Sequence, residues 1–117
     1  MKYLGIYIPD PKTNAGRLTG KRKEDMDAFL AGAIQRGELL MGGGFRSIRE
    51  HGCVVRRTNG KSAVIDGPYA ESKELIGGFA MLEYPSREAA VEGTRRFLEV
   101  AGDGECVTYQ IDDGPAD

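Results

Sequence analysis

The sequence has 117 residues, of which 40% are hydrophobic and 29% charged, a balance typical of one globular domain that can bury a core of its own. Its formal net charge of -2 gives no electrostatic reason to expect nucleic acid or an anionic membrane as a partner. No apolar run approaches the length of a membrane span, and the chain starts on strand-like residues instead of a signal peptide, so we expect a cytoplasmic protein.

The cysteines and the histidine argue against a metal site. Cys53 and Cys106 lie far apart and match neither a C-x-x-C motif nor a zinc-ligand spacing, so we expect two packed thiols and no disulfide. One histidine, His51, is too few for a transition-metal site built mainly on imidazole. We therefore expect no metal and no cofactor.

Residues 2–8 predict a first strand that is apolar on both faces. Its alternating positions form two sets: Leu4, Ile6 and Ile8 on one face, and Tyr3, Gly5 and Tyr7 on the other. Residues 9–20 carry the prolines and glycines of an irregular connection, which is long enough to be either a lid or a flexible loop.

From residue 21 the apolar positions recur at helical spacing. They form one stripe of an amphipathic helix: Met26, Phe29, Leu30, Ala33 and Ile34. Gly37 can end this helix in the left-handed conformation. Residues 38–41 predict a short strand before the glycines 42–44. These glycines favour a flexible turn or a close backbone approach over a phosphate cradle, because no Gly-Lys-Ser/Thr follows. Residues 45–50 remain ambiguous.

A β-hairpin is predicted for residues 53–65. Asn59-Gly60 between two β-rich segments is the strongest short hairpin signal. A two-residue turn fixes the pairing of the two strands: Thr58 with Lys61, Val55 with Val64, and Cys53 with Asp66. The hairpin therefore delivers Asp66 to the end away from its own turn.

The C-terminal third predicts a strand, a helix and a last strand. Residues 76–84 alternate with apolar residues on both faces, and Ser86 is a good N-cap. The buried stripe of the helix is Ala90, Thr94, Phe97, Leu98 and Ala101. Gly102 can end the helix, and residues 105–111 form the last strand. We expect a single domain over residues 1–111, followed by a frayed acidic tail over residues 112–117.

This order of elements predicts an α+β fold, a ferredoxin-like sandwich with an inserted β-hairpin. Two helices can cover only one face of the sheet. The expected open face carries four large side chains: Tyr3, Tyr7, Phe79 and Met81. Such a patch is rarely left to water, so we expect a homodimer through the open sheet face.

The connection over residues 66–74 is the candidate site, because charged side chains crowd into a segment that needs only a turn. Asp66 beside an apolar cleft could act as a general acid or base, or it could close an Asx-type turn. Glu71, Lys73 and Glu74 could orient a polar ligand or hold the loop through ion pairs. The expected ligand-binding residues are Gly67, Pro68, Tyr69, Glu71, Lys73 and Glu74.

The segment DGPYAESKE at residues 66–74, followed by Gly77-Gly78-Phe79, closely resembles the DGPF motif of the YCII-related family, with Tyr69 where phenylalanine is usual. Residues 2–4, 42–44 and 88–89 are also similar to that family. The resemblance implies a dimeric α/β-barrel of ferredoxin-like subunits and a bacterial origin. Most members have no assigned reaction, and some of their genes neighbour or fuse to sigma factors, which implies a regulatory setting.

The resemblance also bears on catalysis. In the wider YCII group, a histidine early in the first helix and an aspartate are suggested as an acid/base pair, and this sequence has Asp25 at the helical position. His51 could serve as the base if folding brings it toward Asp66; otherwise it is a solvated residue. We expect a dimer that binds a small polar ligand near residues 66–74. The alternative is an enzyme that uses Asp66 as general acid/base.

Overall fold

The computed structural model describes residues 1–14, 18–45, 48–66 and 76–112. Its strands are β1 (Lys2–Pro9), β2 (Leu39–Gly43), β3 (Val54–Thr58), β4 (Lys61–Ile65), β5 (Gly78–Glu83) and β6 (Gly104–Gln110). Its helices are α1 (Gly20–Gln35), α2 (Ile48–His51) and α3 (Arg87–Ala101). The α+β class predicted from the sequence is confirmed.

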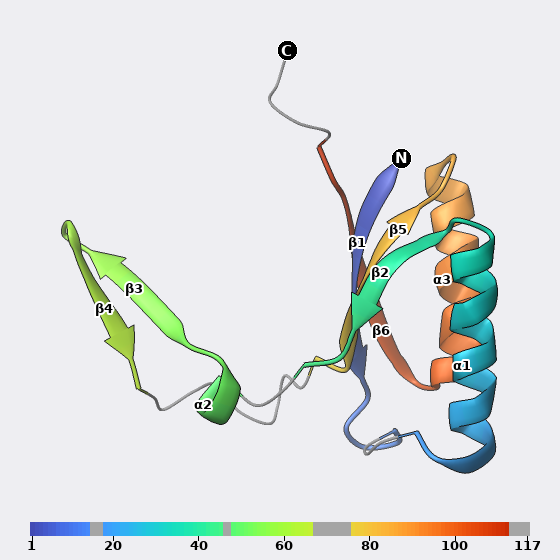
Figure 1. Ribbon diagram of the computed structural model, residues 1–117, viewed down its shortest axis with the longest axis horizontal. Coiled ribbons are helices and arrows are strands. Elements are labelled where there is room, and N and C mark those ends of the chain that lie inside the picture. The colour runs from blue at the N-terminus through green and yellow to red at the C-terminus, as the bar shows by residue number, and fades with distance from the viewer. Residues whose placement is uncertain (15–17, 46–47, 67–75, 113–117) are drawn as a thin grey trace.

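Four strands form the main sheet in the order β2-β5-β1-β6, and every neighbouring pair is antiparallel. Helices α1 and α3 lie side by side on one face of this sheet (Figure 1). This arrangement is compatible with a ferredoxin-like fold. Strands β3 and β4 form a separate two-stranded sheet.

Local sequence signals set the ends of the long helices. Helix α1 ends before Gly37, whose φ of 75° is the left-handed conformation predicted for it. Helix α3 begins after Ser86, whose hydroxyl accepts a hydrogen bond from the Ala89 amide at 3.1 Å. It ends at Gly102, with a φ of 93°. These three predictions are confirmed.

The face of the sheet toward the helices differs from the prediction. Tyr3 is only 4% exposed and packs in the core with Tyr84 and Ala90. The ring of Tyr7 meets Phe97 of α3 edge to face, with centroids 5.3 Å apart. The prediction that Tyr3 and Tyr7 lie on the open face is therefore wrong, because the odd positions of β1 point toward the helices.

The opposite positions of the sheet make the open face. Cross-strand register places Ile6 beside both Phe79 and Val107, and Leu4 beside both Met81 and Tyr109. The apolar residues of the open face, as the register defines them, are Leu4, Ile6, Ile8, Met41, Phe79, Met81, Val107 and Tyr109. The open face is thus apolar as expected. It carries Phe79 and Met81 as predicted, and other residues in place of Tyr3 and Tyr7.

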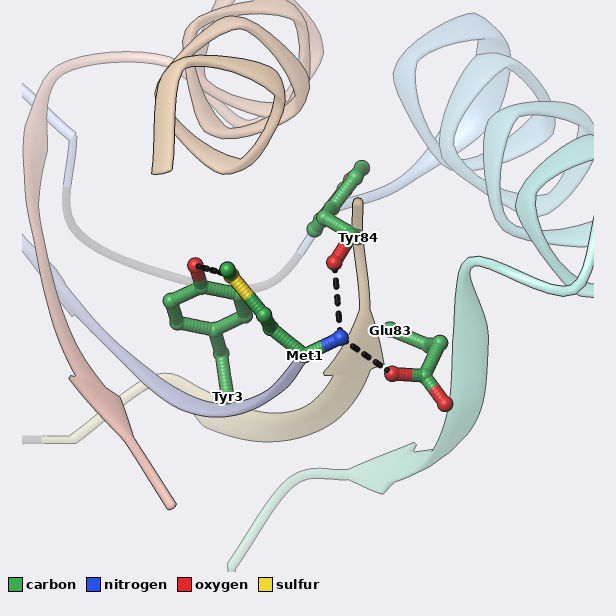
Figure 2. A network of polar contacts seen from close by, with 4 residues as sticks. All are labelled: Met1, Tyr3, Glu83 and Tyr84. Atoms are coloured by element: carbon green, nitrogen blue, oxygen red, sulfur yellow. Dashed lines mark hydrogen bonds and ion pairs between the residues drawn. The ribbon is translucent and has the colours of Figure 1, made fainter. Parts of the chain in front are cut away.

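The first residue fastens β1 to the end of β5. The Met1 amine donates a hydrogen bond to the Tyr84 carbonyl and pairs with Glu83 Oε2, both at 2.9 Å (Figure 2). The Tyr3 hydroxyl reaches the sulfur of Met1 at 3.4 Å. These contacts hold Tyr3 and Tyr84 together at this end of the core.

The hairpin pairs as its turn predicts, with Thr58 opposite Lys61 and Val55 opposite Val64. Its ladder ends at Val54 and Ile65. The hairpin lies away from the main sheet, on the side opposite α1 and α3 (Figure 1). Among the described residues, no helix of the chain is both long and apolar enough to cross a membrane.

Two packing predictions are wrong. Ile34 is 60% exposed because the sheet lies against the neighbouring part of the α1 stripe, where Met26 and Ala33 are buried. Cys53 is exposed, since it lies at the base of the hairpin, whereas Cys106 is partly buried. Both thiols are free.

Candidate functional site

A cavity of about 840 Å³ lies between the sheet and the two long helices. Its floor is a row of small residues across the four strands, which share one face because they are directly opposite one another in the register. The row runs Gly42, Ala80, Gly5 and Thr108. With no large side chain in this row, the helices rest on residues at either end of the sheet and leave space above its middle.

The walls of the cavity are mainly apolar. Phe29 of α1 and Phe97 of α3 meet over it, with ring centroids 6.3 Å apart. Met26, Leu39 and Leu82 also line it. A ligand in this space would therefore contact mainly apolar side chains.

One end of the cavity is polar, where Tyr7 and Asn14 line it. The Tyr7 hydroxyl accepts a hydrogen bond from Asn14 Nδ2 at 2.8 Å and lies within donating distance of the Gly102 carbonyl, at 3.1 Å. Burial raises the pKa of Tyr7, and the Asn14 hydrogen bond offsets part of that effect. Tyr7 is therefore a neutral hydroxyl at physiological pH.

The same polar groups fasten the 9–20 connection to the end of α3. Asn14 Nδ2 also donates to the Ala101 carbonyl at 3.0 Å, and Arg22 Nη2 donates to that carbonyl at the same distance. Thr13 donates to the Asp103 carboxylate at 3.0 Å. These donors satisfy carbonyls that a helix end leaves without intrahelical partners. Hydrogen bonds therefore hold residues 10–14 against the end of α3. Residues 15–17 lie outside the described residues.

Cys106 is the thiol that lines the cavity. Burial raises its pKa from the usual 9.0 to about 11. Because the thiolate is the reactive form, Cys106 is a packing residue of the cavity and not a nucleophile at neutral pH.

The structure places the predicted acid/base residues outside this cavity. Asp66 is exposed at the end of β4, and His51 is exposed in α2, where it lies 3.5 Å from Glu50. No hydrogen bond or ion pair joins Asp66 to His51 in the described chain. The predicted ligand-binding residues, Gly67, Pro68, Tyr69, Glu71, Lys73 and Glu74, lie outside the described residues.

Asp25, at the position of the family's helical histidine, pairs with Lys21 at 2.7 Å on the exposed side of α1. Asp27, one half-turn on, pairs with Lys23 at 2.8 Å, and both of these residues line the cavity. Within residues 1–14, 18–45, 48–66 and 76–112, no group of three or more His, Cys, Asp or Glu side chains could hold a metal ion.

Sequence reasoning missed Tyr7, Asn14 and Cys106 as residues of one cavity. The signal that could have found them is the small-residue row, since Gly5 lies between Tyr3 and Tyr7 on one face of β1 and is opposite Ala80 of β5. Reading that row requires the register between β1, β5 and β6, which the sequence does not supply.

Comparison with known families assigns the chain, because the YCII-related domain matches residues 1–111. The chain belongs to the YCII-related family. The family resemblance predicted from the DGPY motif is thus confirmed, and the match includes every residue that lines the cavity.

Two known proteins are similar to this YCII-related chain. The 3-isopropylmalate dehydratase small subunit of Moorella thermoacetica is 31% identical over 101 residues, which are 81% of this chain and 61% of that protein, so the chain spans about three fifths of that relative. The solved structure of 5-chloro-2-hydroxyhydroquinone dehydrochlorinase from Burkholderia phenoliruptrix AC1100, in complex with 2,5-dihydroxybenzoquinone, aligns over 97% of this chain and 96% of that chain, with a TM-score of 0.48 and 16% identity. Similarity at this level says nothing about shared chemistry.

Proposed function

We propose that this YCII-related protein binds a small, mostly apolar metabolite carrying one hydrogen-bonding group, in the cavity between the sheet and the helices. The observation that carries the proposal is the cavity of about 840 Å³ over a floor of small residues. Ligand sites are typically concave, mainly apolar and few in number, with a small set of polar groups that fix orientation. The volume lies within the usual range of such sites, about 300–1,000 Å³.

The polar end of the cavity gives the ligand its orientation. The Tyr7 hydroxyl and the Asn14 amide already bond to backbone carbonyls and to each other, so their positions are fixed before a ligand arrives. A fixed site loses little conformational entropy on binding, which favours affinity. Because the hydrogens of this pair are already used within the protein, a hydroxyl or amine group on the ligand would donate to the Tyr7 hydroxyl oxygen or to Asn14 Oδ1.

The protein is also proposed to be a homodimer through the open sheet face, as the family resemblance implies. Support comes from the apolar character of that face, where Met41 is 59% and Tyr109 is 57% exposed in the single chain. A second copy covers the same face on both subunits under two-fold symmetry, which closes the two sheets into the dimeric α/β-barrel.

The loop at residues 66–74 keeps a role in both candidate functions. As a binding segment it would contact the polar part of the ligand, in keeping with a regulatory protein. As part of an enzyme it would present Asp66 as general acid/base. Asp66 at the base of an arm that points away from its own cavity could serve only if the loop or the partner subunit brings it there.

The test is a thermal-shift screen of a metabolite library against the wild type, Ala80→Leu and Ala31→Leu. Leucine at position 80 fills the floor of the cavity, whereas position 31 is exposed on α1 and serves as the matched control. A ligand at about 100 times its Kd adds about 2.7 kcal/mol to the native state, a shift of several degrees for a domain of this size. We expect hits in the wild type and Ala31→Leu that disappear in Ala80→Leu.

The unliganded melting temperature of Ala80→Leu shows whether that variant is folded. Hits that persist in folded Ala80→Leu, or a full library without hits, would contradict the cavity as a binding site. Asp66→Asn separates the two functions. A ligand that still binds this variant but is no longer converted identifies Asp66 as the acid/base, whereas a ligand that is bound and never converted by the wild type identifies a binding protein.

A further inference from the structure

The β3–β4 hairpin, here called the arm (residues 54–65), has no core of its own. Val55 and Val64 face each other across the arm and are 61% and 65% exposed. A two-stranded hairpin is at best marginally stable in water unless a third strand or another element covers an apolar side. The two strands of the arm pair with each other. Among the described residues, no strand of the main sheet and neither long helix covers them.

The arm makes the chain unusually extended. The radius of gyration is 16.6 Å, whereas a compact domain of this length has a value of about 13 Å. Two of its principal extents are 45 Å, and the third is 21 Å. The chain thus holds a well-formed element outside the volume that its own core occupies.

The position of the arm favours a second copy of this chain as its partner. The arm lies on the side of the sheet away from α1 and α3, which is the side of the open face (Figure 1). A second copy seated on the open face would therefore lie beside the arm. Each five-residue strand of the arm spans about 17 Å, nearly the width of a sheet of four strands spaced about 4.8 Å apart.

We propose that the arm is a dimerisation element, which packs its Val55–Val64 side on the partner subunit next to the open-face contact. The proposal rests on the proposed homodimer. Two-fold symmetry makes the exchange reciprocal, so each subunit both provides an arm and receives one. The exchange would also carry Asp66, at the base of the arm, toward the partner.

The test compares dimer dissociation constants by sedimentation equilibrium for the wild type, Val55→Lys/Val64→Glu and Val91→Lys. The double variant keeps a favourable cross-strand pair, now ionic, and removes only the apolar side of the arm. Val91 on α3 is also partly exposed, at 41%, and serves as the control for adding a lysine. We expect a dimer dissociation constant that is at least tenfold higher in the double variant and unchanged in Val91→Lys.

A double variant that dimerises within twofold of the wild type would overturn the arm proposal. If the double variant dimerises normally and Ile6→Lys on the open face dissociates the dimer, the proposed sheet-face dimer stands while the arm proposal fails. A wild type that is still monomeric at a protein concentration of about 100 µM overturns both the arm proposal and the proposed homodimer.

Hydrogen exchange of the wild type gives a second readout that does not depend on a variant's folding. We expect the amides of residues 54–65 to exchange at least tenfold more slowly above the dissociation constant than below it. Equal exchange at both concentrations would show that the arm stays in solvent and would overturn the proposal.

Discussion

Tyr7 and Cys106 are adjacent on the helix-facing side of the sheet, directly opposite each other in the register. Burial raises the pKa of both groups, so both are neutral inside the fold at physiological pH. The difference lies in their hydrogen bonds, because the Tyr7 hydroxyl is held by Asn14 and by carbonyls at the end of α3. Tyr7 is therefore the group that can recognise a ligand, and Cys106 is a reporter of whether the cavity is filled.

The reactivity of Cys106 should follow its raised pKa. With a pKa of about 11, the thiolate fraction at pH 8 is about one in a thousand, and it rises about tenfold per pH unit until the pH reaches the pKa. We expect iodoacetamide at pH 8 to modify exposed Cys53 well before Cys106, as followed by peptide mass spectrometry. Equal rates for the two cysteines in the folded protein would contradict this environment, and a bound ligand should slow Cys106 further.

Helix α3 packs unusually close to the end of β5, through Tyr84 and Gly93. A Cβ added at Gly93 would lie 2.6 Å from Tyr84 Cζ and would also overlap the Tyr84 hydroxyl oxygen. Tyr84 is only 8% exposed, so its ring has little room to move away. The glycine allows the ring to lie directly on the helix backbone, and both residues line the cavity.

Gly93→Ala should destabilise the protein by about 1–3 kcal/mol, because the overpacking outweighs the higher helix propensity of alanine. Gly32→Ala in α1 is the matched control, since its added Cβ would meet only the flexible end of Arg36, at 3.0 Å. We expect the control to be equally stable or slightly more stable than the wild type. Urea denaturation measures both, and similar free energies of unfolding for the two variants would refute the close contact.

At the scale of the whole molecule, the chain carries an apolar area on each side of its sheet, and its two long helices cover only one of them. The open face and the arm both lie on the uncovered side (Figure 1). Exposed apolar area of this extent on a small domain marks an interface. This exposed apolar area is the observation behind the proposed homodimer.

Ile6→Lys should dissociate the proposed homodimer, because it places a charge at the middle of the open face, between Phe79 and Val107. Ile34→Lys makes the same chemical change at a residue that is 60% exposed on α1, outside that face. We expect at least tenfold weaker association for Ile6→Lys and none of this loss for Ile34→Lys, measured by sedimentation equilibrium. Circular dichroism confirms that both remain folded, and equal association of the two would place the interface elsewhere.

Much of the fold could be predicted because its signals are local. Gly37 and Gly102 end helices through their own backbone conformation, Ser86 caps α3 with its own hydroxyl, and Asn59-Gly60 sets the hairpin register through one turn. The family could also be predicted, since its motif is a continuous stretch of the chain. Each of these features depends on residues a few positions apart, so no knowledge of the tertiary structure was needed.

The candidate site could not be predicted, because it depends on which face of β1 the helices cover. Both faces of β1 are apolar, so alternation alone does not distinguish the Tyr3–Tyr7 face from the Leu4–Ile6 face. The packing of Tyr3 on Tyr84 and of Tyr7 on Phe97 decides the choice. By itself the sequence determined the two long helices with their ends, the hairpin and the family. Only the tertiary structure decided the cavity and the open face, since both arise from side chains that register and packing bring together from distant parts of the chain.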